Sequence, residues 1–234
     1  MDPQTTLRKN TAFESVPVQK MHRRKFLLFS GAAASAAVVI ASCKKDNTTT
    51  TTNNGIDLGS GDIGILNYAY ALEQLEAAFY TQVTASPFSG ISTVESALLS
   101  DIRDHEIAHR EFFKTALGSK AIADLTPDFS AINFGDRASV LNTAKAFEDL
   151  GVSAYNGAGK LITDPAYLVL AGKIVSVEAR HAAWIRDLLS MGTFADSSAV
   201  DANGLDGAKA PQDVLTIANT FLKTKVSGNN LPTS

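Results

Sequence analysis

The sequence predicts an all-α fold: a four-helix bundle with one long crossover between helices two and three, plus a short helix near the C-terminus. Apolar residues recur at spacings of three and four along four long segments, which is the helical period. Clusters of Pro, Gly and Asp at 118–136 and 192–211 indicate loops. No segment shows a credible strand pattern, so we expect no sheet.

The first two helices are expected at 62–84 and 92–117, and Gly118 is a typical helix stop. Each helix carries one line of residues spaced three or four apart, which share a face. The lines are Leu66, Tyr70, Glu73, Ala77 and Tyr80 in the first helix, and Ile102, Glu106, His109 and Phe113 in the second.

The third and fourth helices are expected at 136–163 and 165–191. Asp164 and Pro165 fit a helix start, with Asp as the N-cap and Pro in the first turn, and Gly192 ends the fourth helix. The aligned residues are Leu141, Ala144, Glu148, Val152 and Tyr155 in the third helix, and Ile174, Glu178, His181, Ile185 and Leu188 in the fourth.

The loop between the second and third helices determines the topology. It has about 18 residues, whereas bundle connections usually have two to eight. Extended at roughly 3.3 Å per residue it reaches about 60 Å, and a helix of about 24 residues is only about 36 Å long. The loop can therefore cross the whole bundle. A shorter fifth helix is expected from about Pro211 to about Lys223.

Composition allows one globular domain and argues against a nucleic-acid partner. The chain has 234 residues, 45% of them hydrophobic, and a formal net charge of −3. Residues 1–43 hold six of the 21 basic and two of the 24 acidic side chains, which leaves 15 basic and 22 acidic in the remainder. Such an acidic body lacks the basic stripe of a nucleic-acid-binding surface.

Residues 1–43 are predicted to be an export signal. A basic stretch ending in HRRKFLL (22–28) precedes an Ala-rich apolar run that is too short for a confident transmembrane span. Arg23-Arg24, followed by Lys and Phe, resembles a twin-arginine signal. Translation starts at Met1 or Met21; the sequence does not distinguish them.

The segment IASC (40–43) resembles the lipobox of bacterial lipoproteins. The resemblance implies that Cys43 is lipidated and anchors an exported protein to a membrane, in the periplasm or at the outer membrane. The alternative is an ordinary cleaved signal with an incidental cysteine. Cys43 is the only cysteine, so the body has no disulfide and no thiolate metal site. A disordered, polar Thr/Asn-rich tether is predicted at 44–61, ahead of the bundle at 62–191 and a C-terminal extension at 192–234.

The two halves of the bundle repeat one pattern. AYALEQLEAAFY (69–80) and AKAFEDLGVSAY (144–155) share a Glu followed seven residues later by a Tyr. IRDHEIAH (102–109) and IVSVEARH (174–181) share I-x-x-x-E-x-x-H. A helix with one core-facing Glu followed by a Glu-x-x-His helix therefore occurs twice.

This pattern has a specific chemical explanation. Residues three apart project from one helix face, so each Glu-x-x-His pair aims at one point. Burying four carboxylates without compensation costs several kcal/mol each in effective terms. Divalent cations supply the missing charge and accept both carboxylate oxygen and imidazole nitrogen. One Glu on each of two helices, with Glu-x-x-His on the other two, is the di-iron carboxylate ligand set.

Residues 62–191 resemble the ferritin-like superfamily and are most similar to exported ferritin-like-domain proteins related to plant desiccation-related proteins. The resemblance implies two metal ions per chain, iron first and manganese as the alternative, with Glu106 and Glu178 bridging them. Tyr80 and Tyr155 match tyrosines that hydrogen-bond ligand carboxylates. No catalytic residue is implied beyond the ligands, which are Glu73, Glu106, His109, Glu148, Glu178 and His181.

Several interpretations stay open at this point. The ionisable residues could form a polar network in a bundle that has lost its metals. Glu76, one turn after Glu73, is either a further ligand or a solvated neighbour. His105 is expected at the surface or behind the ligands. Trp184, Phe112 and Phe113 are expected in the core.

The resemblance implies a redox protein of the cell envelope that oxidises Fe(II) or reduces O₂ or peroxide in stress protection. The chain has no Cys-x-x-Cys electron-donor module, so electrons would come from an external donor. The alternative is a non-enzymatic stress-related or interaction scaffold with structural metal or none. The oligomeric state is not predicted.

Overall fold

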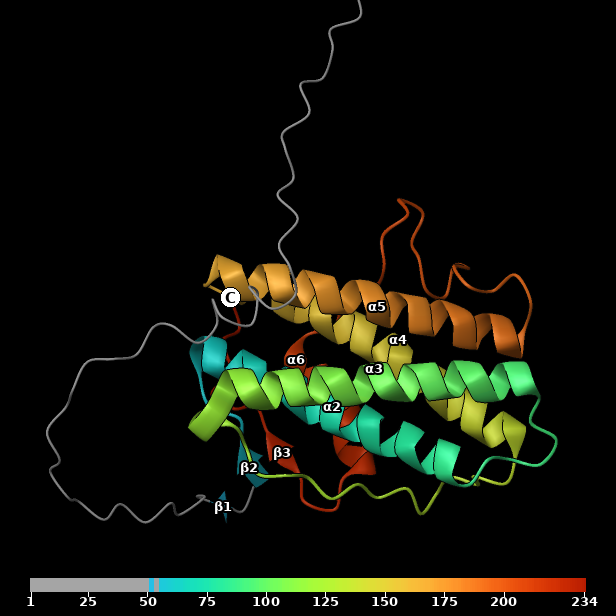
Figure 1. Cartoon of the computed structure of the whole chain (residues 1–234). Coiled ribbons are helices and arrows are strands. Elements are labelled where there is room, and N and C mark those ends of the chain that lie inside the picture. Colours follow the sequence, from blue (N-terminus) through green and yellow to red (C-terminus); the bar gives the residue numbers. More distant parts are fainter. Residues whose placement is uncertain (1–50, 53–54) are drawn as a thin grey trace, which may run out of the picture. The chain divides into compact units, whose positions relative to one another are not determined.

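Four long helices form the body of the computed structural model, which describes residues 51–52 and 55–234 (Figure 1). They are α2 (Gly61–Ala85), α3 (Thr93–Leu117), α4 (Arg137–Gly159) and α5 (Pro165–Leu189). The predicted all-α, four-helix architecture is therefore confirmed, and the helix ends differ from the predicted ones by four residues at most.

Side chains at the helix starts explain these boundaries. Ser92 and Glu95 form a reciprocal capping box at the start of α3. The Asp136 side chain accepts the Ser139 amide at the start of α4. Asp164 accepts the Ala166 amide and is followed by Pro165, as the sequence predicted.

The third helix ends at Gly159, four residues earlier than predicted. The Asp62 carboxylate at the start of α2 accepts the amides of Thr163 and Asp164, both at 2.8 Å. These bonds hold the end of the connection to α5 against the start of α2. A tertiary contact therefore ends the helix, although its apolar pattern continues.

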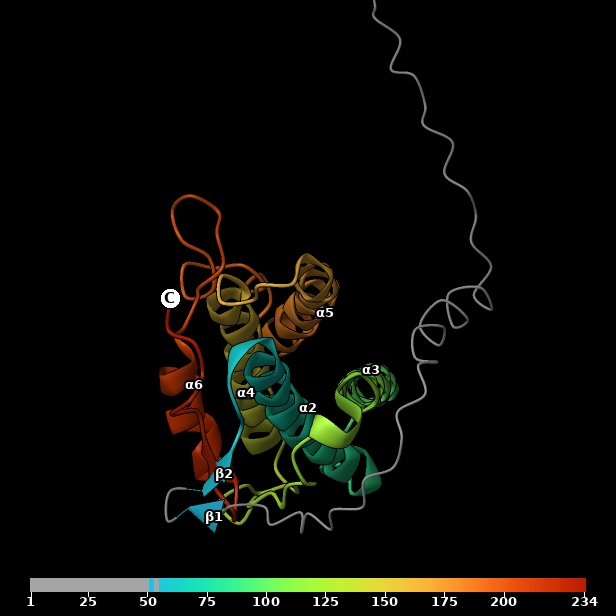
Figure 2. The ribbon, with the colours of Figure 1, turned by 90° about the vertical axis from the view of Figure 1, so that its left-hand side faces the viewer.

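The helices pair as two hairpins, α2 with α3 and α4 with α5. Seen end on, α2 and α4 lie between α6 (Pro211–Ala218) on one side and the outer helices α3 and α5 on the other (Figure 2). As a result α2 is buried around almost its whole circumference: Tyr68, Tyr70, Phe79 and Tyr80 are each at most 1% exposed. Side chains on the inner face of α2 therefore point into a buried interior.

The long connection between α3 and α4 crosses the length of the bundle, as predicted. It begins with the 3₁₀ turn η1 (Gly118–Lys120), where the Lys120 carbonyl accepts a hydrogen bond from Asn67 near the start of α2. Midway, the Leu125 amide donates to Gln74 at 2.7 Å. At the far end the carbonyl of Gly135 accepts the Ser89 amide, just beyond the end of α2.

The prediction that the chain contains no strand was wrong. β1 (Thr51–Thr52), β2 (Gly55–Asp57) and β3 (Val226–Ser227) form a small sheet, with β2 antiparallel to β1 and parallel to β3. Strands of two or three residues are too short to show an alternating pattern.

The sheet ties the end of the predicted tether to the C-terminal segment. Ile56 is 8% exposed and Leu58 is fully buried, so residues 55–61 belong to the folded body rather than to a disordered tether. The expected fifth helix consists of α6 and the 3₁₀ turn η2 (Asn219–Phe221), followed by the buried Leu222.

The predicted export signal, Cys43 and residues 44–50 of the tether lie outside the described residues. Among the residues that the structure describes, no helix combines the length and the apolar character needed to cross a bilayer.

Candidate metal centre

The structure brings all six predicted ligands together in the middle of the bundle, one or two from each long helix. The four glutamates, one per helix, have no exposed surface, His181 is 4% exposed, and the His109 side chain is 13% exposed. Each Glu-x-x-His pair aims inward because residues three apart share a helix face. The residues are Glu73 on α2, Glu106 and His109 on α3, Glu148 on α4, and Glu178 and His181 on α5.

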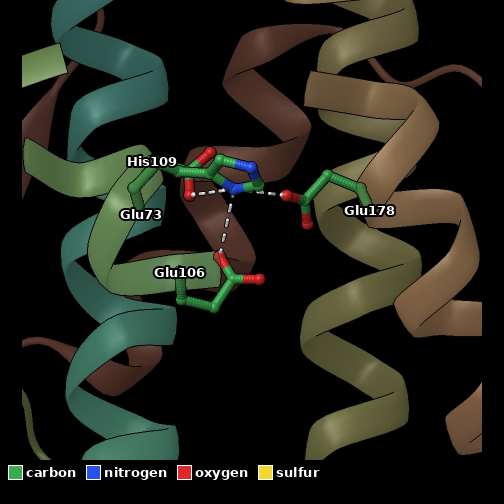
Figure 3. Close-up of side chains that lie close together, drawn as sticks. All are labelled: Glu73, Glu106, His109 and Glu178. Atoms are coloured by element: carbon green, nitrogen blue, oxygen red, sulfur yellow. Dashed lines mark ion pairs between the residues drawn. The ribbon is translucent and has the colours of Figure 1, made fainter. Parts of the chain in front are cut away.

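His109 lies between three carboxylates (Figure 3). Its Nδ1 atom is 3.0 Å from Glu178 Oε1, 3.4 Å from Glu73 Oε2 and 3.7 Å from Glu106 Oε2. Three helices therefore converge on one nitrogen atom.

His181 occupies the corresponding place in the other half. Its Nδ1 atom is 2.8 Å from Glu106 Oε1 and 3.4 Å from Glu148 Oε2. The two oxygens of Glu106 thus face different histidines, which is the arrangement that a bridging carboxylate needs.

The ligand atoms form two overlapping groups of four, in each of which all atoms lie within 4.8 Å of one another. Both groups contain Glu106 and Glu178. The first adds Glu73 and His109, and the second adds Glu148 and His181. Two carboxylates shared between two sets, each completed by its own Glu and His, fit a di-metal site.

The unpaired polar atoms support the same interpretation. Eight buried oxygen and nitrogen atoms of these residues have no hydrogen-bond partner within the part of the chain that the structure describes. Buried polar groups are nearly always paired, so eight such atoms in one place require an explanation. They are both oxygens of Glu106 and Glu178, one oxygen of Glu73 and Glu148, and Nδ1 of both histidines.

Two tyrosines account for the remaining carboxylate oxygens. Tyr80 donates to Glu148 Oε1 at 2.5 Å, and Tyr155 donates to Glu73 Oε1. Glu73 and Glu148 each keep one free oxygen, as terminal ligands would, while the two shared glutamates keep both. The tyrosines fix the orientation of the terminal carboxylates.

Protons hold the cluster together when no cation is bound. Burial, opposed by His109, raises the pKa of Glu73 to about 7, and burial with neighbouring carboxylates raises that of Glu178 well above its ordinary range. Burial also acts on Glu106, but both histidines outweigh it and hold its pKa at about 2. Although burial disfavours imidazolium, the carboxylates raise the pKa of His109 to about 12 and that of His181 to about 10. Metal ions would have to displace these protons.

His105 contacts the ligands from the solvent side. Its side chain is exposed, and its Nδ1 lies 3.0 Å from Nε2 of His181, the nitrogen that points away from the cluster. In the other half the repeat has Val177 at this position. His105 is therefore a partner that orients the ring of His181. Comparing the two repeats in the sequence would have singled out His105.

Glu76 is the second residue whose place the sequence left open. The residue is 4% exposed, so the alternative that Glu76 is a solvated neighbour of Glu73 does not apply. The repeat has Gly151 at the equivalent position, so the two halves of the centre are not chemically identical.

Two of the three aromatic residues predicted for the core were misplaced. Phe113 is 3% exposed, but Phe112 is 36% and Trp184 is 52% exposed. Both lie on outer helices that bury only one face, and successive residues on a helix point about 100° apart. Being apolar was not sufficient evidence for burial.

Comparison with known proteins agrees with this geometry. A model of the ferritin-like domain family matches residues 61–191, a segment that contains all four long helices and all six candidate ligands. Among curated proteins no match was found. Because the matched segment is more than half of the chain, this protein belongs to the ferritin-like domain family.

Proposed function

We propose that the protein holds a pair of iron ions in this cluster and uses them to oxidise Fe(II) or to reduce O₂ or peroxide in stress protection. The observation that carries the proposal is the set of eight unpaired ligand atoms, arranged as two groups that share Glu106 and Glu178. The same donor set suits manganese.

The residues have distinct tasks in this proposal. Glu73 and His109 hold one metal, Glu148 and His181 hold the other, and the two shared carboxylates hold both. A bound pair of redox-active metals supplies the electrons for O₂ or peroxide chemistry. The protein orients the ligands through its tyrosines and keeps bulk water out of the bundle.

An apolar cavity beside the centre supports a small non-polar oxidant. It measures about 40 Å³ and is lined by Leu66, Ala69, Phe113 and Tyr155, among other residues. Tyr155 connects the cavity to the cluster, because its hydroxyl donates to Glu73. A cavity of this size is large enough for a molecule of a few atoms. Dioxygen fits both its size and its apolar walls.

Anaerobic loading with Fe(II), followed by air, tests the proposal on the full chain. We expect about two tightly bound irons per chain, an oxidised-iron absorption band, and oxygen uptake that continues while Fe(II) or another reductant is supplied. A Glu106→Gln/Glu178→Gln variant serves as the metal-free control. Two bound metals that raise the melting temperature without any oxygen or peroxide turnover would favour the scaffold alternative instead.

We further propose that the protein is exported, anchored by a lipid on Cys43, and related to desiccation-related proteins within its family. The twin-arginine pattern at 23–26 and the IASC segment support this location. Because twin-arginine export carries folded proteins, metals could be loaded before transport. We expect radiolabelled palmitate to be incorporated into the full chain but not into Cys43→Ser; equal labelling would contradict the anchor.

A further inference from the structure

His105 and His181 face each other edge to edge at the solvent side of the centre. Nδ1 of His105 lies 3.0 Å from Nε2 of His181, the ring centres are 5.2 Å apart, and the ring planes differ by 8°. The difference between the two distances is close to the largest that two imidazole rings allow, so both nitrogens lie on the line that joins the ring centres. The N–H bond and the lone pair of imidazole nitrogens lie in the ring plane, so this contact has the geometry of an N–H···N hydrogen bond.

Metal binding determines which of the two rings donates this hydrogen bond. Nδ1 of His181 faces the cluster, 2.8 Å from Glu106 Oε1 and 3.4 Å from Glu148 Oε2, and is the nitrogen that can bind a metal. A neutral imidazole that binds metal through Nδ1 carries its proton on Nε2. His181 is therefore the donor, and Nδ1 of His105 is the acceptor. Such a partner fixes the ring of a metal-binding histidine and makes its ligand nitrogen more basic.

The other half of the centre has no equivalent of this contact. The repeat places Val177 where the first half has His105, and an aliphatic side chain accepts no hydrogen bond. His109 approaches the carboxylates through Nδ1, and its side chain is 13% exposed, against 5% for His181. Water weakens the attraction between a cation and its ligands. Both the hydrogen bond and the burial therefore favour the position at His181.

We propose that the two metal positions are inequivalent, and that the position at Glu148 and His181 binds metal first because His105 holds its imidazole in place. This inference rests on the proposed di-metal function. Loss of an outer partner of a ligating histidine weakens metal binding by about 10- to 100-fold, so we expect the two affinities to differ by at least about tenfold. His105 is a positioning residue that acts through His181. The second metal then completes the pair at Glu73 and His109.

Zinc titration of the full chain, labelled with ¹⁵N at histidine, tests the order of filling. Zn(II) accepts the same nitrogen and oxygen ligands and has a filled d shell, so it does not broaden NMR signals. The chain has four histidines, which keeps the number of ring signals small. We expect the ring signals of His181 to move during the first equivalent of Zn(II), and those of His109 only during the second. The Nε2 proton of His181 should give a slowly exchanging signal.

Two variants of His105 separate hydrogen bonding from packing. His105→Leu removes the acceptor, and we expect the first binding step to weaken by at least about tenfold, so that both positions fill together. His105→Asn places an amide oxygen close to the position of Nδ1, and should restore the order of filling and the Nε2 proton signal. Val177→Ala changes the equivalent position of the other repeat and is the matched control, in which neither step should change.

The order of filling in the wild type is decisive even without a variant. If His109 responds first, or if both histidines respond together, the inequivalence is overturned and the di-metal proposal stands. If His105→Leu does not weaken the first step, or if His105→Asn weakens it equally, the role of His105 is overturned. Wild-type protein that binds neither Zn(II) nor Fe(II) would overturn this inference and the proposed function together.

Discussion

Glutamine at either Glu106 or Glu178 is expected to abolish binding of both metals, whereas Glu73→Gln should weaken only one. Glu106 and Glu178 belong to both ligand groups, and Glu73 belongs to one. Metal analysis after gel filtration should give about two metals per chain for the wild type and near zero for either shared-ligand variant. For Glu73→Gln we expect about one. Equal losses at all three positions would contradict the division into shared and terminal ligands.

The Glu106→Gln and Glu178→Gln variants should have opposite effects on the stability of the metal-free protein. The Glu106 carboxylate lies close to both histidines, and its pKa of about 2 shows that its charge is stabilised in the fold. Removing it leaves two buried imidazolium groups less well paired, which we expect to destabilise the protein by about 3–5 kcal/mol. The raised pKa of Glu178 shows that the fold disfavours the charge of this carboxylate. We therefore expect Glu178→Gln to stabilise the metal-free protein by on the order of 1 kcal/mol.

Denaturant unfolding in the presence of a chelator measures both effects. Glu111→Gln is a suitable control, because Glu111 lies on the same helix as Glu106 with a side chain that is 54% exposed. It should change neither metal content nor stability appreciably. A loss of stability in both shared-ligand variants would show that the carboxylates act only as packing groups.

The internal repeat is what made the centre predictable. Glu-x-x-His is common on helices, but its occurrence on two helices, each preceded by a helix with Glu and Tyr seven apart, restricts the arrangement in space. Helical geometry then converts the spacing into a shared face, and the length of the 118–136 loop selects the crossover topology. These are local properties of the chain, so the sequence alone was sufficient to predict that the six side chains gather inside the bundle.

What the sequence did not predict depends on tertiary contacts. The strands at Gly55–Asp57 and Val226–Ser227 form only because distant segments meet. The burial of Glu76 depends on the missing side chain at Gly151, on another helix. The contact of His105 with His181 likewise joins two helices. Both residues stand where the repeats differ, so such positions indicate where the two halves of a pseudo-symmetric site have different tasks.

The metal-free protein is expected to lose stability as the pH rises from about 5 to 8. Glu73 releases its proton near pH 7 in the fold and Glu178 well above its ordinary pKa, against about 4.5 for both when unfolded. Above about pH 6.5 the unfolded histidines lose protons that His109 and His181 keep up to about pH 12 and pH 10. The folded state thus holds more protons throughout, and each extra proton lowers stability by about 1.4 kcal/mol per pH unit.

Bound metal should reverse this dependence, because metal binding requires deprotonated ligands and so strengthens as the pH rises. Melting curves between pH 5 and 8, with chelator or with Mn(II), are expected to diverge as the pH increases. Metal added in weak buffer should release at least two protons per chain, one from each histidine. Glu106, with a pKa of about 2, titrates below this window and does not disturb it. Glu178→Gln removes one contributing group, so its metal-free curve should be flatter than that of the wild type. A metal-free melting temperature that rises from pH 5 to pH 8 would show that the carboxylates are ionised and solvated, which is incompatible with a buried cluster held together by protons until metal replaces them.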